Sequence, residues 1–431
     1  MLKTELNYLR SLEKFEKIKP GLDTMQSLMT ALGDPQDTFS SIHIAGTNGK
    51  GSTAAFLNSV LNQTKFRVGL YTSPHLHRFN ERIVANNMAI SDKRLSELIL
   101  VVREASKTAR VTPTYFEFTT AVAFLHLAQQ KVDIAIIEVG MGGDLDATNV
   151  ISPFLSIITN IGLDHTKWLG ETKLAIADRK AGVIKEGVPL ITAEEDPNII
   201  SFLKRRCAQK NAPVFTLKEH LTTTLEKRTL SEQTFSTKGV MDDTFTIPLL
   251  GDHQIKNAAT AILATNVINT KKLLQERIST TNIQKGLSLV EWPGRFDIVS
   301  RDPFILIDGA HNEQGYLALS ESLDSYTLPS PDILVLGIKR DKDPKILLEN
   351  IVPRFRKIIV TEAEHDPYPA ARLAKLIYQP TKKVQVIPKL SLAIQQAKKD
   401  LRPKSMLLIT GSLYLAGDAL SIIKVNKNLP S

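Results

Sequence analysis

The sequence predicts an α/β protein with two domains: a larger N-terminal domain built on a mostly parallel sheet, and a smaller α/β domain after it. Its 431 residues exceed the size of one ordinary domain and suit two. Short β-branched apolar runs alternate with helical segments, which is typical of parallel βαβ units. The alternation breaks at a Trp-Pro-Gly segment in residues 291–295, because proline and glycine interrupt regular structure. We therefore expect the domains at residues 1–294 and 298–431.

Five apolar runs in the first domain predict strands, with helices between them. The expected strands are residues 41–45, 68–72, 132–139, 154–160 and 188–192, and the clearest expected helices are residues 93–104, 117–130 and 171–184. Runs 132–139 and 154–160 are almost continuously apolar. That pattern is typical of parallel strands covered on both faces.

Residues 221–248 show a different pattern, rich in Thr and Ser and alternating every two residues. It predicts a small β insertion, an antiparallel hairpin at the edge of the first domain, followed by a helix over residues 253–269. Five more strands are expected at residues 304–307, 333–336, 357–360, 384–387 and 406–410. Their alternation with helices predicts a doubly wound, Rossmann-like C-terminal domain.

The composition disfavours several classes of protein. No stretch reaches the roughly 18–20 consecutive apolar residues of a membrane span, and the first residues lack the pattern of a secretory signal. The single cysteine, Cys207, excludes an internal disulfide and fits a reducing cytoplasm. The formal charge of +9 is spread without a basic block, which disfavours nucleic acid and leaves anionic small molecules as partners. We expect a cytoplasmic monomer, because no long apolar surface run is evident.

A glycine-rich loop between a strand and a helix is the strongest functional signal. It runs Gly46-Thr47-Asn48-Gly49-Lys50-Gly51-Ser52. Glycines let several backbone N–H groups face one anion, and the helix adds its positive end. We expect Lys50 to reach the terminal phosphates of ATP, and Ser52 to face the nucleotide or its Mg²⁺. The first domain is therefore predicted to be of the P-loop type, although Ile44 replaces the first glycine of the strict pattern; a plain strand–turn–helix corner is the alternative.

Further motifs accompany this loop in a fixed order. They are residues 71–76 (YTSPHL), 78–83 (RFNERI), 138–143 (EVGMGG), 145–149 (LDATN), 162–165 (GLDH), 180–182 (KAG), 308–312 (DGAHN) and 411–414 (GSLY). Together with the loop, they resemble the folylpolyglutamate synthase and dihydrofolate synthase family of the Mur ligase superfamily. The resemblance extends over nearly the whole chain.

The resemblance implies an ATP-dependent ligase that adds L-glutamate to the glutamate tail of a folate through an acyl phosphate. One or two Mg²⁺ ions would accompany the nucleotide, and the resemblance assigns Ser73, Glu138 and His165 to metal binding. The residues themselves favour Glu138, because an acid directly after an apolar strand is costly to bury without a partner. His165 is equally a loop histidine, and Ser73 is equally a turn residue before Pro74.

The resemblance also implies catalytic and nucleotide-binding roles. Lys180 matches a position that is commonly carbamylated in the family, and a solvated lysine is the alternative. Asn257 matches an adenine contact, while Arg295 and Asp308 match phosphate and ribose contacts. His311 is expected near the acyl phosphate. The nucleotide would then lie between the two domains.

A site for the folate substrate is implied by a third group of positions. They are Arg82 and, near the pterin, Phe116, Glu117, Phe118, Leu145, Asp146 and Ala147. An aromatic ring can stack on a flat pterin, and a carboxylate can accept its N–H donors. Phe116 and Phe118 are equally compatible with a plain core.

One departure from the family bears on the substrate. Asp144 stands where many members carry arginine, and some members that act only as folylpolyglutamate synthases carry aspartate there. This favours polyglutamylation of reduced folates over the bifunctional alternative, which also joins dihydropteroate to glutamate. Two other classes stay open: a cell-wall ligase of the same superfamily, and a regulatory nucleotide switch or nucleic-acid-binding protein without turnover.

Overall fold

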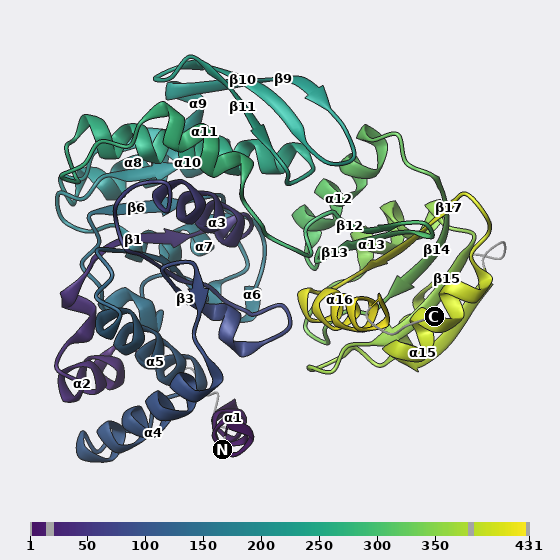
Figure 1. The fold of residues 1–431 in the computed structure, drawn as a ribbon, viewed down its shortest axis with the longest axis horizontal. Coiled ribbons are helices and arrows are strands. Elements are labelled where there is room, and N and C mark those ends of the chain that lie inside the picture. The colour runs from purple at the N-terminus through teal and green to yellow at the C-terminus, as the bar shows by residue number, and fades with distance from the viewer. Residues whose placement is uncertain (1, 14–20, 378–382, 428–431) are drawn as a thin grey trace.

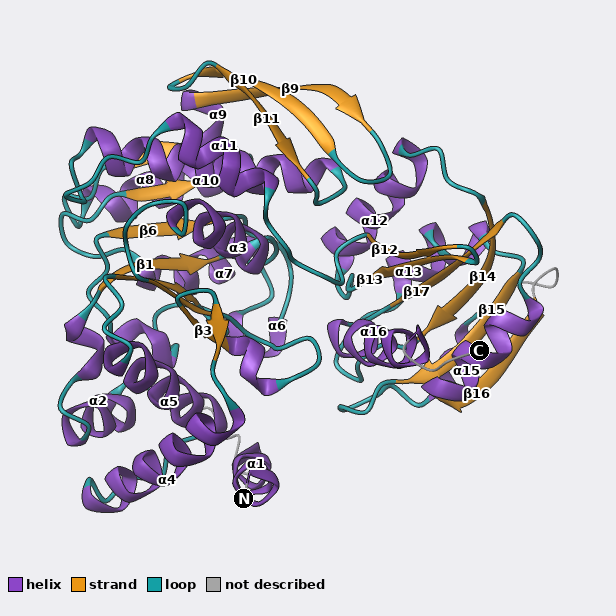
Figure 2. Ribbon diagram, in the orientation of Figure 1, coloured by secondary structure: helices purple, strands orange, loops and turns teal. Residues whose placement is uncertain are grey.

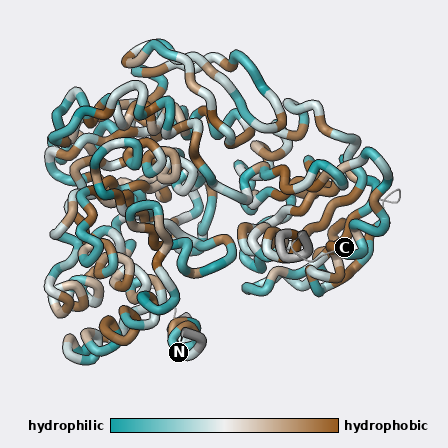
Figure 3. Tube along the Cα trace, viewed as in Figure 1, coloured by the Kyte–Doolittle hydropathy of each residue, from teal (hydrophilic) through white to brown (hydrophobic). Residues whose placement is uncertain are grey.

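The structure is a computed structural model, and it describes residues 2–13, 21–377 and 383–427. Two α/β domains lie side by side and are joined near residues 289–296 (Figure 1). The predicted fold class is confirmed, because each domain contains its own largely parallel sheet. Helices cover both faces of each sheet (Figure 2), and the most apolar parts of the trace follow the strands (Figure 3).

The N-terminal sheet has eight strands in the order β4-β3-β2-β5-β1-β6-β7-β8. Its parallel strands are β1 (Ser40–Ala45), β2 (Val68–Tyr71), β5 (Ile134–Glu138), β6 (Leu155–Ile158), β7 (Leu190–Thr192) and β8 (Val214–Thr216). Two short antiparallel strands, β3 (Ile83–Ala85) and β4 (Met88–Ala89), close one edge. The five predicted strands correspond to β1, β2, β5, β6 and β7, whereas β3, β4 and β8 were not predicted.

Helices pack on both faces of this sheet. They are α1 (Leu2–Glu13), α2 (Asp23–Ala31), α3 (Lys50–Leu61), α4 (Asp92–Thr108), α5 (Tyr115–Gln129), α6 (Thr166–Leu169), α7 (Lys173–Lys180), α8 (Pro197–Ala208), α9 (Leu217–His220), α10 (Asp252–Thr270) and α11 (Thr280–Ser288). One core lies between the sheet and α3, α10 and α11, and another between the sheet and α1, α2, α4 and α5. Both cores use β5: Ile136 faces the first and Ile137 the second, as a doubly covered strand requires.

The insertion is larger than the predicted hairpin. It forms a separate antiparallel sheet of three strands, β9 (Leu221–Arg228), β10 (Gln233–Gly239) and β11 (Asp243–Ile247), in the order β11-β10-β9. The predicted β insertion is present, but the prediction of a two-stranded hairpin was wrong, because a third strand pairs with it. The alternating apolar residues of β10 and β11 face the core formed with α10 and α11. Phe235 and Phe245 are fully buried there, with ring centroids 5.9 Å apart.

The C-terminal sheet has six strands in the order β12-β13-β17-β14-β15-β16. They are β12 (Asp297–Arg301), β13 (Phe304–Asp308), β14 (Ser330–Leu336), β15 (Lys357–Glu362), β16 (Lys383–Lys389) and β17 (Ser405–Thr410). Helices α12 (Glu313–Ser325), α13 (Lys345–Asn350) and α14 (Ala370–Leu376) cover one face, and α15 (Leu390–Asp400) and α16 (Leu413–Lys427) cover the other. Only the antiparallel edge strand β12 was not predicted. No helix of the described ranges is long and apolar enough to span a bilayer.

Replacing Phe235 with Ala should reduce the free energy of unfolding of the N-terminal domain by about 3–5 kcal/mol, because it empties a fully buried aromatic site. Urea denaturation followed by circular dichroism measures the change. Leu225→Ala is the control, since Leu225 pairs with Phe235 across the strands but is 41% exposed. Equal losses in the two variants would contradict the packing of the insertion on the core.

Candidate active site

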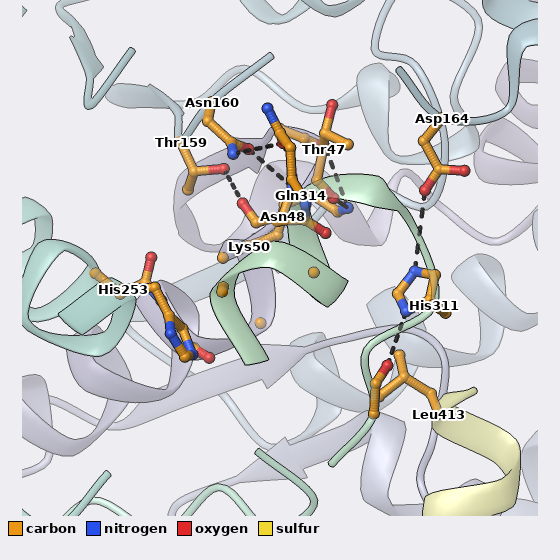
Figure 4. Close-up of a pocket in the computed structure, with 18 of the residues that line it drawn as sticks. Thr47, Asn48, Lys50, Thr159, Asn160, Asp164, His253, His311, Gln314 and Leu413 are labelled. Carbon is orange, nitrogen blue, oxygen red and sulfur yellow. Dashed lines mark hydrogen bonds and ion pairs between the residues drawn. The ribbon is translucent and has the colours of Figure 1, made fainter. Parts of the chain in front are cut away.

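One cavity of about 290 Å³ lies between the two domains and is lined by both. Its N-terminal wall is formed where β1, β5 and β6 end, and its C-terminal wall is formed by the end of β13 and the start of α12. Parallel strands end at the same edge of a sheet, and open α/β sheets bind ligands at that edge. Figure 4 shows residues of both domains converging on this space.

The glycine-rich loop forms the floor of the cavity between β1 and α3. Gly49 has a φ of 81°, a left-handed conformation that favours glycine. Gly46 packs so closely that an added Cβ would lie 1.8 Å from the hydroxyl oxygen of Thr159. The N–H of Thr47 donates to the carbonyl of Asn160 at 2.9 Å, and the N–H of Asn48 donates to Asn160 Oδ1 at 2.8 Å. The loop is therefore fixed by its own domain.

Two lysines converge on the first glycine of the loop. Lys50 Nζ donates to the carbonyl of Gly46 at 3.1 Å, and Lys180 Nζ donates to the same carbonyl at 2.8 Å. Lys180 is buried, which makes the solvated alternative wrong. Burial, together with the nearby Lys50 charge, lowers the pKa of Lys180 to about 7. The floor of the cavity thus places the amino groups of two lysines where an anion would lie.

The three residues assigned to metal binding line the same cavity. Glu138 is the last residue of β5 and is buried, and it accepts a hydrogen bond from the N–H of Ser73 at 3.0 Å. Burial raises the pKa of Glu138, although the Lys50 charge opposes this rise. No ion pair involves Glu138 within the described ranges, so a bound cation would offset the cost of burying its carboxylate.

The donor set suits Mg²⁺ better than a transition metal. No group of three or more His, Cys, Asp or Glu side chains that could hold a metal occurs among residues 2–13, 21–377 and 383–427. Mg²⁺ is commonly bound by one or two protein groups, with water and substrate phosphates completing its shell. Glu138, the Ser73 hydroxyl and His165 fit that scheme, with the His165 side chain 38% exposed at the cavity wall.

The expected nucleotide contacts also line the cavity. Asn257 Nδ2 donates to Gln254 Oε1 at 3.0 Å on α10, and the side chain of Asn257 approaches the backbone of Gly49. Asp308 accepts hydrogen bonds from the N–H groups of Phe296 and Ala310 at 2.8 and 2.7 Å. These bonds hold the interdomain link against the end of β13. Arg295, on that link, also lines the cavity.

His311 lies on the C-terminal side of the cavity (Figure 4). Its Nδ1 lies 2.9 Å from the carbonyl of Gly309, so Nδ1 carries the proton and Nε2 is left with a lone pair. Nε2 lies 3.9 Å from a carboxylate oxygen of Asp164. Enclosure between the domains lowers the pKa of His311, although Asp164 opposes this effect, and the ring is therefore neutral at pH 7.

The residues expected around a pterin lie outside the lining of this cavity. Phe118 is fully buried against Tyr8, so the core alternative describes it. Glu117 caps α5 by accepting from the N–H of Thr114 at 2.7 Å, which is a structural task. Phe116 is the nearest of the group to the cavity, because its ring packs directly on Gly140, a lining residue.

The other four residues differ in exposure. Arg82 is buried, donates to His75 Nδ1 at 2.8 Å and stacks on two aromatic rings. Asp146 is buried and accepts from Thr148 and from the N–H of Met141. Ala147 is buried, whereas Leu145 is 40% exposed.

Several residues in or beside the cavity wall were not predicted from the sequence. Asp164 forms an ion pair with Lys342 of the C-terminal domain, and Asn312 and Gln314 contact the phosphate loop. A signal for Asn312 existed, since it follows His311 in the DGAHN motif. Lys342 lies in a charged loop after β14. The sequence of this loop has no periodicity from which the position of Lys342 could be predicted.

The two α/β domains that share this cavity match the two domains of a Mur-type ligase. The chain matches the family of the Mur ligase middle domain over residues 44–265, and the family of the Mur ligase glutamate ligase domain over residues 294–413. More specifically, the chain belongs to the folylpolyglutamate synthase and dihydrofolate synthase family of these ligases.

Individual relatives support this assignment over nearly the full length. The chain is 36% identical to a dihydrofolate synthase/folylpolyglutamate synthase of Bacillus subtilis, covering 94% of this chain and 96% of the relative. It is 35% identical to a folylpolyglutamate synthase of Lacticaseibacillus casei, covering 90% and 91%. The crystal structure of a folylpolyglutamate synthase of Thermotoga maritima superimposes with a TM-score of 0.85 at 32% identity, covering 98% and 97%. These relatives are folate enzymes, so a cell-wall ligase is not favoured.

Replacing Lys50 with Ala should lower kcat by at least about 1,000-fold, because Lys50 would screen the charge that develops on the transferred phosphoryl group. The melting temperature should stay within about 2 °C, since the described bonds of Lys50 Nζ go to loop carbonyls and not to the core. Steady-state kinetics and thermal melts measure the two quantities. The exposed Lys285→Ala on α11 is the control; near-normal kcat in Lys50→Ala would refute the role of the loop.

Proposed function

We propose that the chain adds L-glutamate to the glutamate tail of tetrahydrofolate, with ATP consumed as the source of energy. The observation that carries this proposal is the convergence of the phosphate loop, Lys50, Lys180 and Glu138 on one cavity that the C-terminal domain closes. Similar structures support it: one folylpolyglutamate synthase is complexed with AMPPCP and folate, with a TM-score of 0.84 at 32% identity, covering 98% of this chain and 99% of that one.

The reaction needs two displacements. A folate carboxylate oxygen attacks the γ-phosphorus of ATP, ADP leaves, and an acyl phosphate forms. The amino nitrogen of glutamate then attacks the acyl carbon, phosphate leaves, and one proton is lost from the amine. The protein therefore has to align the groups, screen negative charge and accept a proton.

Residues of this chain suit each task. The loop backbone from Gly46 to Ser52, the N-terminus of α3 and Lys50 would hold the phosphates. Neutral His311, with its Nε2 lone pair, can take the proton from the incoming amine. Glu138, Ser73 and His165 would hold Mg²⁺, which supplies charge neutralisation at the phosphates when bound. Asn257, Arg295 and Asp308 are proposed to contact the nucleotide.

The folate ring is proposed to bind beside this cavity, next to Gly140. Phe116 packs on Gly140, and Arg82, Leu145, Asp146 and Ala147 are the further candidates. Glu117 and Phe118 are weaker candidates, because one caps α5 and the other is enclosed in the core.

Dihydrofolate synthesis is the second candidate function. Its support is the Bacillus subtilis relative, which carries both activities in its name. Against it stands Asp144, at a position where the resemblance implies arginine in many members, and its carboxylate pairs with Arg179 at 2.8 Å. Assaying dihydropteroate and tetrahydrofolate side by side distinguishes the two functions.

ADP release should depend on both tetrahydrofolate and L-glutamate. In the proposed reaction the γ-phosphoryl group is transferred only to a bound folate carboxylate, and the acyl phosphate is then consumed by glutamate. A coupled assay measures ADP with both substrates, with each alone and with neither. With dihydropteroate in place of tetrahydrofolate, ADP should be released at no more than about one tenth of the rate. A tenfold difference corresponds to about 1.4 kcal/mol of activation free energy. If ADP is released at the same rate with and without the two substrates, the proposal is rejected in favour of a nucleotide switch.

We also propose that Lys180 is carbamylated in the active protein. With its pKa at about 7, a large fraction of Lys180 is a neutral amine at neutral pH. A neutral amine can attack CO₂, lose a proton and become an anionic carbamate. The carbamate would replace a cation with an anion beside the cavity floor and could support a metal ion there.

Protein equilibrated with ¹³C-bicarbonate should show one carbamate carbon in ¹³C NMR, and Lys180→Ala should lose both this signal and activity. The signal should weaken as the pH falls below about 7, because the ammonium form of Lys180 cannot react. Lys185→Ala is the matched control, since burial also lowers the pKa of Lys185 but that residue lies outside the cavity lining. A signal that survives in Lys180→Ala would refute the modification.

The domain limits 1–294 and 298–431 and a monomeric state remain proposals. The last strand of the N-terminal half, β11, and the first of the C-terminal sheet, β12, are separated by α10, α11 and the link at residues 289–296. Limited proteolysis and size-exclusion chromatography with light scattering test the two proposals.

A further inference from the structure

Asn312 connects the two domains at the edge of the phosphate loop. It is buried and directly precedes α12, where its Oδ1 accepts from the N–H of Gly315 at 2.9 Å and so caps the helix. The same side chain forms a reciprocal pair with Asn48: Asn48 Nδ2 donates to Asn312 Oδ1 at 3.1 Å, and Asn312 Nδ2 donates to Asn48 Oδ1 at 3.0 Å.

The orientation of the Asn312 amide is fixed by two neighbours. The N–H of Gly315 requires an oxygen on one side, and the carboxylate of Asp164 requires a donor on the other, where Asn312 Nδ2 lies 3.0 Å from Asp164 Oδ2. Because Asn312 is fixed, the pairing amide of Asn48 is fixed as well. One side chain of the C-terminal domain therefore holds the phosphate loop and the segment after β6 together.

Two more C-terminal side chains support this contact. Gln314 Oε1 accepts from Asn48 Nδ2 at 3.2 Å and from Asn160 Nδ2 at 3.1 Å (Figure 4). Lys342, whose side chain is only 8% exposed, forms an ion pair with Asp164. The contact is thus polar, directional and largely shielded from water, so a change in the position of either domain would break several bonds at once.

The loop backbone does not need these bonds. The N–H groups of Thr47 and Asn48 bond to Asn160, and the hydroxyl of Thr159 donates to the carbonyl of Asn48 at 2.6 Å, all within the N-terminal domain. Only the side chain of Asn48 reaches the other domain. Nucleotide binding and domain contact are therefore carried by different atoms of the same loop.

We infer that Asn312 is a positioning residue that locks the C-terminal domain onto the phosphate loop. Its neighbour His311 is thereby held with Nε2 3.9 Å from Asp164, and the C-terminal wall is held over the loop. Loss of the lock should slow transfer without weakening nucleotide binding. The inference rests on the proposed nucleotide site at this loop.

Asn312→Asp tests the inference while preserving the helix cap, because aspartate is as good an N-cap as asparagine. The variant still accepts from Gly315 and Asn48, but it loses both donated bonds and places a carboxylate against Asp164. We expect kcat to fall by about 10- to 100-fold while KM for ATP stays within about 3-fold.

Asn198→Asp is the matched control, since the same exchange falls in the first turn of α8, at an exposed site outside the cavity lining. Adding Asp164→Asn to Asn312→Asp restores a donor–acceptor pair with the roles exchanged, and kcat should recover by at least about 5-fold over the single variant. Rescue of this kind is not expected if Asn312 merely caps α12.

Three outcomes would overturn the inference: kcat within 2-fold of the wild type in Asn312→Asp, a rise in KM for ATP that matches the loss of kcat, or no recovery in the double variant. A parallel assay of Lys50→Ala distinguishes failure of the inference about Asn312 from failure of the proposed nucleotide site. If Lys50→Ala is inactive while Asn312→Asp is normal, only the lock is wrong; if both are normal, the nucleotide site itself is wrong.

Discussion

The close packing of Gly46 against Thr159 is the constraint on which the site depends. Strand β1 lies between β5 and β6, with Ile44 opposite Glu138 and Ala45 opposite Ile158, so the chain must turn at once where these strands end. A side chain at position 46 would collide with Thr159. Because glycine permits the approach, the loop bonds to Asn160, and Lys50 and Lys180 both reach the carbonyl of Gly46.

Ionisable side chains near the phosphate loop are buried with few hydrogen-bond partners to offset their loss of solvation. Glu138 is held by one backbone N–H, and Lys180 by one carbonyl, so desolvation shifts the pKa of each toward its neutral form. In a ligase that binds ATP, the negative phosphates and the proposed Mg²⁺ would supply the opposite charges and so offset these desolvation costs. Groups that are already oriented need no rearrangement when charge develops in the transition state.

Local patterns predicted most of the fold, and the rest depended on tertiary contacts. Strands with continuous apolar runs were found, whereas the two-residue strand β4 and the edge strand β12 carry no such run. The buried position of Lys180 was not evident, although it lies one helical turn from the apolar pair Ile176 and Ala177 on α7. The cap formed by Glu117 could have been predicted, since Thr114-Tyr-Phe-Glu117 is a capping box.

The phosphate loop is shaped by contacts within its own domain, whereas one of its side chains contacts the other domain. The bonds of Asn48 to Asn160 and Thr159 stay within the N-terminal domain, so the backbone of the loop does not depend on the C-terminal domain for its shape. An acyl phosphate, however, is readily hydrolysed, so it is best formed only when the cavity is closed to water. The contacts with the C-terminal domain are made by the side chain of Asn48, so they leave the backbone N–H groups of the phosphate loop unchanged. The geometry therefore separates the atoms that shape the phosphate loop from the side chain through which the C-terminal domain contacts it.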